Sequence, residues 1–285
     1  MYDRDPVIRN LIALSPPTLP DAAPLEYVQA AAAAGYDAVG LRLSPSPLFP
    51  YHPIVADAPL IRELKTVLAS SGLSVLDILS FYLQPDTDVE AFAPALELGA
   101  EFGARYALVC GDDSDWARLR GHMGRFCDLA AQFGIVAALE FAVIRPLATL
   151  SQALRLLSEL GRKNGVICLD PLNFVRGGGS AALLRGLEPR LFPYAQISDG
   201  VLDPGEPDLS KLGRMGPNQR RMPGEGTLPL RHILDALPAG LPLSVEIPMP
   251  PTVRFSAREW ARATADGTRR FLDEYYRAKQ AGRPS

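Results

Sequence analysis

The fold is decided by residues 135–170, IVAALEFAVIRPLATLSQALRLLSELGRKNGVICLD. Two short apolar runs, each followed by an acidic residue, enclose a longer helix-like segment at 147–160. Gly161 comes directly after that segment, where a residue able to adopt positive φ commonly ends a helix. A strand, a helix and a second strand in this order predict two parallel strands joined by a crossover helix.

The same alternation continues outward to both ends of the chain. We expect strands at 10–14, 38–43, 74–81, 106–110, 135–141, 166–170, 193–198 and 243–247. We expect helices at 25–34, 58–71, 89–103, 114–133, 147–160, 180–187, 230–236 and 256–279. Eight such units predict an α/β protein with a (β/α)8 TIM barrel as a single domain over residues 1–285. An open doubly wound sheet usually begins with a glycine-rich turn, whereas Ser15-Pro16-Pro17-Thr18 follows the first strand here.

The composition excludes several classes of partner. The chain has 285 residues, 47% of them hydrophobic and 21% charged, which suits one α/β barrel. With a formal net charge of -3 and scattered basic residues, it should bind a small molecule and neither nucleic acid nor membrane. The three cysteines form no CxxC pair, and the first ten residues do not resemble a signal peptide. We therefore expect a cytoplasmic protein, and whether it forms a homo-oligomer stays open.

The last four predicted strands end on side chains that could bind a metal ion. These residues are Glu140, Asp170, Gln196 and Glu246. Barrel enzymes carry their catalytic groups at the C-terminal ends of the strands. Carboxylates that converge in a barrel mouth of low dielectric constant repel one another unless a cation compensates them. Because all the ligands are oxygen atoms, Mn²⁺ or Mg²⁺ is favoured over zinc, and Co²⁺ could substitute.

The alternation of side chains along a strand provides a check on this interpretation, because residues two apart share a face. Small residues beneath the four ligands should face the barrel interior: Ala138, Cys168 and Ser244. Large apolar residues next to the ligands should face the helices: Leu139, Leu169, Ile197 and Val245. Any one acid alone could equally cap a helix or pair with an arginine, but polar ends on four consecutive strands favour a shared metal.

These residues and their surroundings resemble the xylose isomerase-like superfamily of sugar phosphate isomerases and epimerases. The matching segments are ALEF with Glu140, CLDPLNF with Asp170, YAQISDG with Gln196, LSVEIP with Glu246, and RMPGEG before the seventh helix. The resemblance covers nearly the whole chain. It implies one divalent metal held by the four residues and a reaction through an enediolate. It also implies that Glu140 and Glu246 lie on opposite faces of the substrate and serve as base and acid.

The chain departs from that family at two positions. Gln196 stands where many epimerases have His, which resembles the inosose dehydratases and some 3-dehydroshikimate dehydratases. Asn173 stands where the family often has a His that contacts the substrate; Asn can hydrogen-bond but cannot shuttle a proton near neutral pH. The first departure favours a lyase, and the second leaves Asn173 as a substrate-binding residue.

Three further residues are candidates for substrate binding. Arg42 ends the second strand, and His52 lies in the loop that follows it. Arg221 lies in a long loop at about 199–226, together with Arg214 and Arg220. This loop leaves the active face of the barrel and could close over an anionic or polyhydroxy substrate, although a solvated surface loop is the alternative.

The sequence therefore predicts a metal-dependent sugar or sugar phosphate isomerase or epimerase that acts on a small polyhydroxy carbonyl compound. A dehydratase is the alternative that Gln196 favours, and a non-catalytic sugar-binding barrel is the alternative from another class. A DNA-repair endonuclease of the same fold would use several zinc-binding histidines and a basic groove. The chain has only three histidines and no such charge pattern.

Overall fold

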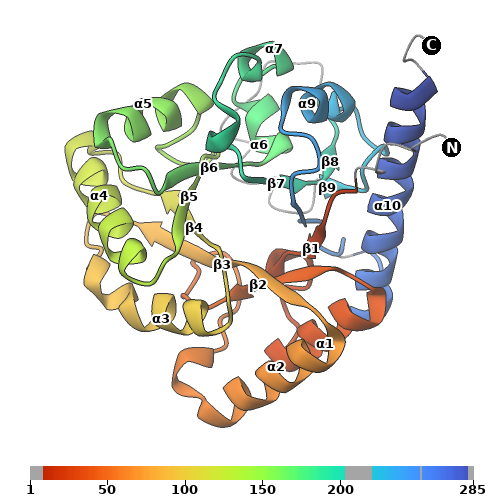
Figure 1. Cartoon of the computed structure of the whole chain (residues 1–285), viewed down its shortest axis with the longest axis horizontal. Helices are drawn as coiled ribbons and strands as arrows, with labels where there is room; N and C mark the ends of the chain where they lie inside the picture. Colours follow the sequence, from red (N-terminus) through yellow and green to blue (C-terminus); the bar gives the residue numbers. More distant parts are fainter. Residues whose placement is uncertain (1–8, 203–219, 251, 282–285) are drawn as a thin grey trace, which may run out of the picture.

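The computed structural model describes residues 9–202, 220–250 and 252–281. Parallel strands form a closed barrel in the order β1-β10-β7-β6-β5-β4-β3-β2 (Figure 1). These strands are β1 (Ile12–Leu14), β2 (Ala38–Arg42), β3 (Ser74–Leu83), β4 (Tyr106–Gly111), β5 (Val136–Glu140), β6 (Gly165–Leu169), β7 (Tyr194–Ile197) and β10 (Leu243–Val245). The predicted (β/α)8 TIM barrel is confirmed, with every strand within a few residues of its expected position.

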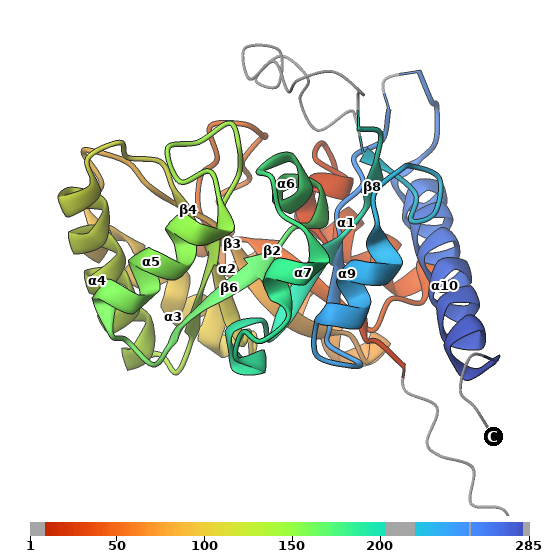
Figure 2. The same ribbon diagram turned by 90° about the horizontal axis from the view of Figure 1, so that it is seen from above.

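Helices surround the barrel, and the long C-terminal helix runs along one side of the molecule (Figures 1 and 2). The α-helices are α1 (Pro24–Ala34), α2 (Ala58–Ser71), α3 (Ala93–Glu101), α4 (Trp116–Gln132), α5 (Leu150–Leu160), α6 (Pro171–Arg176), α7 (Ala181–Leu184), α9 (Leu230–Ala236) and α10 (Ala257–Ala281). Short 3-10 turns are η1 (Pro16–Thr18), η2 (Ile54–Ala56), η3 (Val89–Phe92) and η4 (Pro189–Leu191).

Three helices differ from the sequence-based expectation. The helix expected at 89–103 is divided into η3 and α3, because Pro94 lacks a backbone N–H and starts a new helix. The helix expected at 180–187 ends already at Leu184. Helix α6 was not predicted; it starts at Pro171, and the Asp170 carboxylate caps it by accepting the Asn173 backbone N–H at 2.9 Å.

Side chains alternate along the strands as the sequence predicts. Ala138 and Cys168 pack inside the barrel, whereas Leu139 and Leu169 pack in the layer between strands and helices. The interior also contains an aromatic pair, because Tyr194 lies 4.7 Å from Tyr106 between ring centroids. Since Tyr194 shares a face with Gln196, the floor of the barrel mouth is partly aromatic and not built from small residues alone.

A small antiparallel sheet brings a distant segment back to the barrel mouth. It pairs β8 (Asp199–Gly200) with β9 (Arg220–Arg221). The buried Asp199 carboxylate accepts backbone N–H groups of Gly200 at 2.8 Å, Gly224 at 3.0 Å and Leu228 at 3.0 Å. Gly226 fits closely here, because a Cβ atom would lie 2.3 Å from Asp199 Oδ1. Asp199 therefore fixes the segment that follows Arg220.

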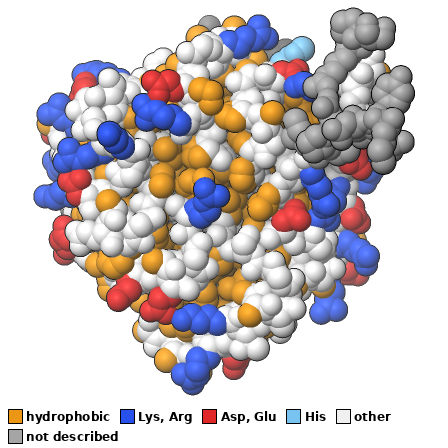
Figure 3. Space-filling model, in the orientation of Figure 1, with side chains coloured by type: hydrophobic (Ala, Val, Ile, Leu, Met, Phe, Trp, Pro, Cys, Tyr) orange, Lys and Arg blue, Asp and Glu red, His pale blue; other side chains and the backbone are white. Residues whose placement is uncertain are grey.

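The molecular surface in Figure 3 carries basic and acidic side chains interspersed around a central area of hydrophobic residues. No large patch of one sign of charge is visible on this face, in keeping with the formal net charge of -3. Within the described residues, no helix combines the length and the apolar character needed to cross a bilayer.

Candidate active site

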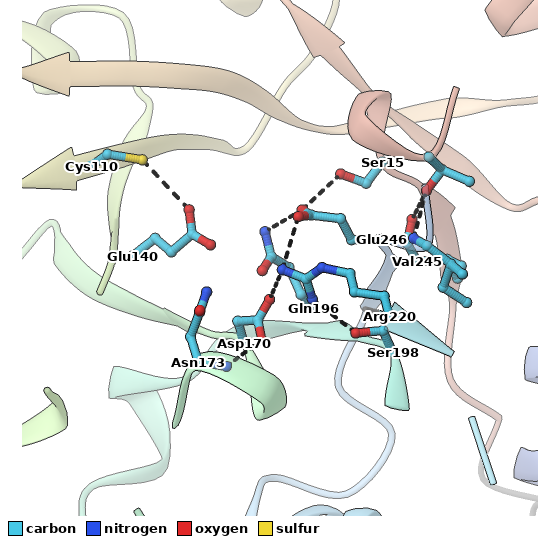
Figure 4. A network of polar contacts seen from close by, with 12 residues as sticks. Ser15, Cys110, Glu140, Asp170, Asn173, Gln196, Ser198, Arg220, Val245 and Glu246 are labelled. Atoms are coloured by element: carbon cyan, nitrogen blue, oxygen red, sulfur yellow. Dashed lines mark hydrogen bonds and ion pairs between the residues drawn. The ribbon is translucent and has the colours of Figure 1, made fainter. Parts of the chain in front are cut away.

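The four predicted metal ligands all lie at the C-terminal end of the barrel. Glu140 is the last residue of β5, Gln196 lies in β7, and Asp170 and Glu246 directly follow β6 and β10. Figure 4 shows Asp170, Gln196 and Glu246 in one polar network with Arg220, while Glu140 lies across the site beside Cys110. The structure therefore brings together residues that are far apart in sequence, as the strand-end pattern predicts.

The guanidinium group of Arg220 lies between two of the carboxylates (Figure 4). Its Nη2 atom is 2.6 Å from Asp170 Oδ2 and 3.1 Å from Glu246 Oε1, and its Nη1 donates to Ser198 Oγ at 2.8 Å. Arg220 is only 8% exposed. Although burial alone would lower the pKa of Arg220, the charges of Asp170 and Glu246 outweigh it and raise the pKa above its usual value. Arg220 is therefore a firmly held positive charge.

Glu246 is surrounded by hydrogen-bond donors. Gln196 Nε2 donates to Glu246 Oε2 at 2.8 Å, and Ser15 Oγ donates to the same atom at 3.4 Å. Burial raises the pKa of Glu246, and the positive charge of Arg220 opposes that rise. These contacts favour the ionised carboxylate in a fixed orientation.

Glu140 has a different environment. Among the residues that the structure describes, its side chain has one hydrogen bond, the weak donation from Cys110 Sγ to Oε2 at 3.5 Å. Burial, followed by the charges of Glu246 and Asp170, raises the pKa of Glu140 to about 8. This pKa favours the protonated form of Glu140 at neutral pH in the arrangement seen here. The pKa of Glu246 is raised as well, by burial and by the charge of Asp170, but Arg220 opposes that rise.

The donor set suits a divalent metal ion. Four side chains can offer oxygen ligands, and the buried Gln196 Oε1 atom has no hydrogen-bond partner in the described part of the chain. The repulsion that raises the pKa of Glu140 is also what a bound cation would relieve. As the described side chains stand, however, no three acidic, histidine or cysteine groups lie close enough together to chelate an ion. Because Arg220 lies between Asp170 and Glu246, metal binding requires its guanidinium to withdraw.

The predicted substrate-binding residues fall in three places. Asn173 lies on α6, with its side chain near Asp170 and Glu140 (Figure 4). Arg221 is exposed, and its Nη1 atom donates to the Arg220 carbonyl at 3.3 Å, so it does not join the network. Arg42 and His52 line one pocket at the end of β2. Arg214 lies outside the described residues. Substrate binding by these residues stays a prediction.

Arg145 is a site residue that sequence reasoning missed. Its buried side chain pairs with Asp112 at 3.1 Å and lies over the Tyr82 ring, 4.8 Å from guanidinium carbon to ring centroid. The charge of Glu140 contributes to raising the pKa of Arg145 against the effect of burial. Nothing in the local sequence after β5 distinguishes this arginine from a surface residue.

Comparisons with known proteins agree with this geometry. The family model for the xylose isomerase-like TIM barrel matches residues 28–274. No curated protein sequence matches the chain. Among solved structures, a fusion of a xylose isomerase-like TIM barrel with 4-hydroxyphenylpyruvate dioxygenase has a TM-score of 0.78 at 17% identity. The alignment covers 97% of this chain but 45% of that protein, so the chain spans less than half of its length.

Two further solved structures match over nearly their full lengths. The IolI protein with a bound zinc atom has a TM-score of 0.76 at 17% identity, covering 93% of this chain and 98% of that one. The 3-keto-D-glucoside 4-epimerase of E. coli has a TM-score of 0.68 at 14% identity, covering 93% of this chain and 100% of that one. At these identities the likeness establishes a shared fold alone.

Proposed function

Because the chain belongs to the xylose isomerase-like TIM barrel family, we propose that it is a divalent-metal-dependent isomerase or epimerase. Its substrate is a small polyhydroxy carbonyl compound, and its reaction passes through an enediolate. The observation that carries the proposal is the convergence of four oxygen-bearing side chains at the C-terminal end of the barrel: Glu140, Asp170, Gln196 and Glu246. Within the described residues, Glu246 is held by Arg220, Gln196 and Ser15, whereas Glu140 accepts a hydrogen bond from the Cys110 thiol alone.

This contrast suits the two proton transfers of an isomerase. Glu246, oriented by Gln196 and Ser15, removes a proton from the carbon next to the substrate carbonyl. Glu140, which lies across the site from Glu246, returns a proton to the intermediate. The hydrogen bonds that orient Glu246 thus favour it as the base and leave Glu140 as the acid, the reverse of the order that the family resemblance suggests.

The remaining residues orient the substrate and compensate charge. Arg220 and Asn173 can donate hydrogen bonds to substrate oxygen atoms. The stacked rings of Tyr106 and Tyr194 fill the barrel interior below them. When bound, a divalent ion held by Glu140, Asp170, Gln196 and Glu246 would polarise the substrate carbonyl and stabilise the enediolate.

A dehydratase is the second candidate, and Gln196 is the observation that favours it. The same site would act as a lyase if Glu140 gave its proton to a departing β-hydroxyl group and not to carbon. A non-catalytic sugar-binding barrel would hold a sugar without either transfer. The identity of the products separates these three functions.

The test is an incubation of the Mn²⁺-treated protein with keto-sugars in D₂O, followed by NMR and mass spectrometry. We expect deuterium next to the carbonyl carbon in isomerised or recovered sugar, without loss of water. A product lighter by one water would establish the dehydratase. No exchange and no new product with any sugar, despite measurable sugar binding, would favour the binding protein.

A variant links the activity to the proposed base. Glu246→Gln keeps an oxygen ligand but removes the base, so we expect a rate loss of at least about 100-fold with only weakened Mn²⁺ binding. Glu97→Gln, on the exposed face of α3, is the matched control. A wild-type rate in Glu246→Gln would contradict the assigned role.

A further inference from the structure

The turn that follows β1 holds the backbone on both sides of Glu246. The Thr18 hydroxyl donates to the Val245 carbonyl at 2.7 Å and accepts the Ile247 backbone N–H at 3.0 Å. Thr18, Val245 and Ile247 are all buried, with no more than 1% of their surface exposed. A hydroxyl can make both bonds because it is a donor and an acceptor at once. One side chain therefore fixes the two peptide groups that flank the proposed base.

Two prolines explain why a side chain takes the place of a strand here. Strand β1 pairs with β10 as far as Val245, and the Ser15 backbone N–H extends this ladder by one bond to the Val245 carbonyl at 3.0 Å. The next two residues, Pro16 and Pro17, have no N–H and cannot extend it further. The chain turns into η1 instead, and the hydroxyl of its last residue supplies a donor and an acceptor beside Glu246.

The backbone around Glu246 is also held from two other elements. The Glu246 backbone N–H donates to the Ile197 carbonyl at the end of β7, at 3.2 Å. The Ile247 carbonyl accepts the Trp260 Nε1–H of α10 at 2.8 Å. The side chain of Glu246 in turn accepts the Ser15 hydroxyl, which belongs to the same turn as Thr18 (Figure 4). The turn after β1 thus contacts both the backbone and the carboxylate at this position.

Loss of the Thr18 hydroxyl would affect these contacts unequally. The Val245 carbonyl would keep the Ser15 N–H, but the buried Ile247 N–H would lose its acceptor. A buried N–H without a partner is costly, so the backbone after β10 would move toward another acceptor. The movement occurs one residue from Glu246. A displacement of a catalytic group by about 1 Å can lower a rate by about 100-fold.

We propose that Thr18 is the positioning residue for Glu246, and that the Ser15-Pro16-Pro17-Thr18 turn holds the proposed base in place in the barrel mouth. The proposal rests on the isomerase function proposed above. Thr18 is buried and acts through the peptide groups on both sides of Glu246, without contacting the substrate.

The kinetics of two Thr18 variants test the proposal. Thr18→Val has a similar shape but lacks the hydroxyl. We expect kcat of the Mn²⁺-saturated protein to fall about 10- to 100-fold while KM changes by less than about 3-fold, because the base moves and the substrate-binding groups stay. Thr18→Ser keeps the hydroxyl and should recover most of the lost kcat. A wild-type kcat in Thr18→Val, or no recovery in Thr18→Ser, would overturn the proposal.

Thr264→Val is the matched control. It also removes a buried threonine hydroxyl, one that bonds to the Tyr36 phenol at 2.8 Å. Tyr36 comes just before β2, at the end of the barrel opposite the mouth. We expect this variant to lower stability and to leave kcat unchanged. An equal loss of kcat in Thr264→Val and Thr18→Val would reduce Thr18 to a structural role.

Crystal structures of the metal-free wild type and Thr18→Val measure the position of Glu246 without turnover. We expect the Glu246 carboxylate to lie about 0.5–1 Å from its wild-type position in Thr18→Val, and to return to that position in Thr18→Ser. An unmoved carboxylate in Thr18→Val would overturn the proposal even if turnover were slower. If Thr18→Val does not fold, Thr18→Ala serves instead, because it also lacks the hydroxyl.

The two proposals can fail separately. A displaced Glu246 in Thr18→Val, in a protein that exchanges no deuterium into any keto-sugar, would remove the isomerase and leave the positioning role. Exchange at equal rates in the wild type and Thr18→Val would leave the isomerase and remove the positioning role.

Discussion

Arg220 decides the charge balance of the barrel mouth at the scale of single residues. Three carboxylates and one amide converge there, and the guanidinium contacts two of the carboxylates at 2.6 and 3.1 Å. A divalent ion and this guanidinium compete for the same oxygen atoms. We therefore expect Arg220 to stabilise the metal-free protein and to weaken the proposed metal binding.

The variant Arg220→Met separates these two effects. We expect its Mn²⁺ affinity to rise about 10-fold and its metal-free thermal midpoint to fall, because the carboxylates lose their internal cation. Calorimetry and thermal unfolding measure both quantities. Arg221→Met, at the exposed neighbouring position, should leave both unchanged. Weaker Mn²⁺ binding in Arg220→Met would show that the guanidinium does not compete with the metal.

The difference between Arg220 and Arg221 also marks what the sequence could not predict. The positions of all four strand-end residues were predictable, because each stands at the end of a short apolar run and these runs alternate with helix-like segments along the chain. Successive residues of β9 point to opposite faces, so Arg220 enters the site and Arg221 does not. A strand of two residues is too short to show an alternation of apolar and polar side chains, so the sequence could not predict which arginine faces the site. The raised pKa of Glu140 was equally unpredictable, because it depends on burial and on the charges of Glu246 and Asp170 from other strands.

At the scale of elements, one carboxylate positions the segment that carries Arg220. Asp199 accepts three backbone N–H groups, two of them from the segment that follows β9. The strands were predictable from their apolar runs, but this connection was not, since side-chain to backbone bonds of a loop leave no periodic signal. The sequence also did not predict helix α6. This helix has too few residues to show a helical period, and Asp170, the residue that caps it, was interpreted as a metal ligand.

Asp199→Ala should therefore alter the proposed metal site, although Asp199 is not one of its four predicted ligands. Loss of the buried acceptor leaves N–H groups unpaired, and we expect a decrease of about 2–3 kcal/mol in the free energy of unfolding. Without Asp199, the Arg220 guanidinium should be held less firmly and should compete less with Mn²⁺ for the carboxylates of Asp170 and Glu246. The Mn²⁺ affinity of Asp199→Ala should therefore approach that of Arg220→Met. Urea unfolding and calorimetry measure these effects, with the exposed Asp86→Ala as the control. Unchanged metal affinity despite the lower stability would argue against this positioning role.

At the scale of the whole molecule, a buried carboxyl inside the barrel makes stability depend on pH. Asp77 in β3 is 2% exposed, and burial, with a further contribution from Glu246, raises its pKa to about 7. In the unfolded chain this carboxyl ionises near pH 4. The raised pKa of Asp77 therefore does not lower the free energy of unfolding below about pH 4. It lowers this free energy increasingly between about pH 4 and pH 7, and by the full amount above about pH 7.

Asp77→Asn removes the ionisation and should reverse this trend. We expect the variant to gain stability relative to the wild type as pH rises from about 4 to 7, reaching on the order of 2–4 kcal/mol. Urea unfolding at a series of pH values measures the difference, with the exposed Asp86→Asn as the control. Parallel stability profiles for wild type and Asp77→Asn would contradict the raised pKa.

One divalent ion per chain, bound at the barrel mouth, underlies the proposed chemistry. Elemental analysis of the purified protein, combined with thermal unfolding after chelation and after addition of Mn²⁺, measures it. We expect close to one ion per chain, a lower unfolding midpoint after chelation, and recovery of the midpoint with Mn²⁺. No bound ion and no response of the midpoint to Mn²⁺ would leave the barrel intact but remove the metal-dependent isomerase.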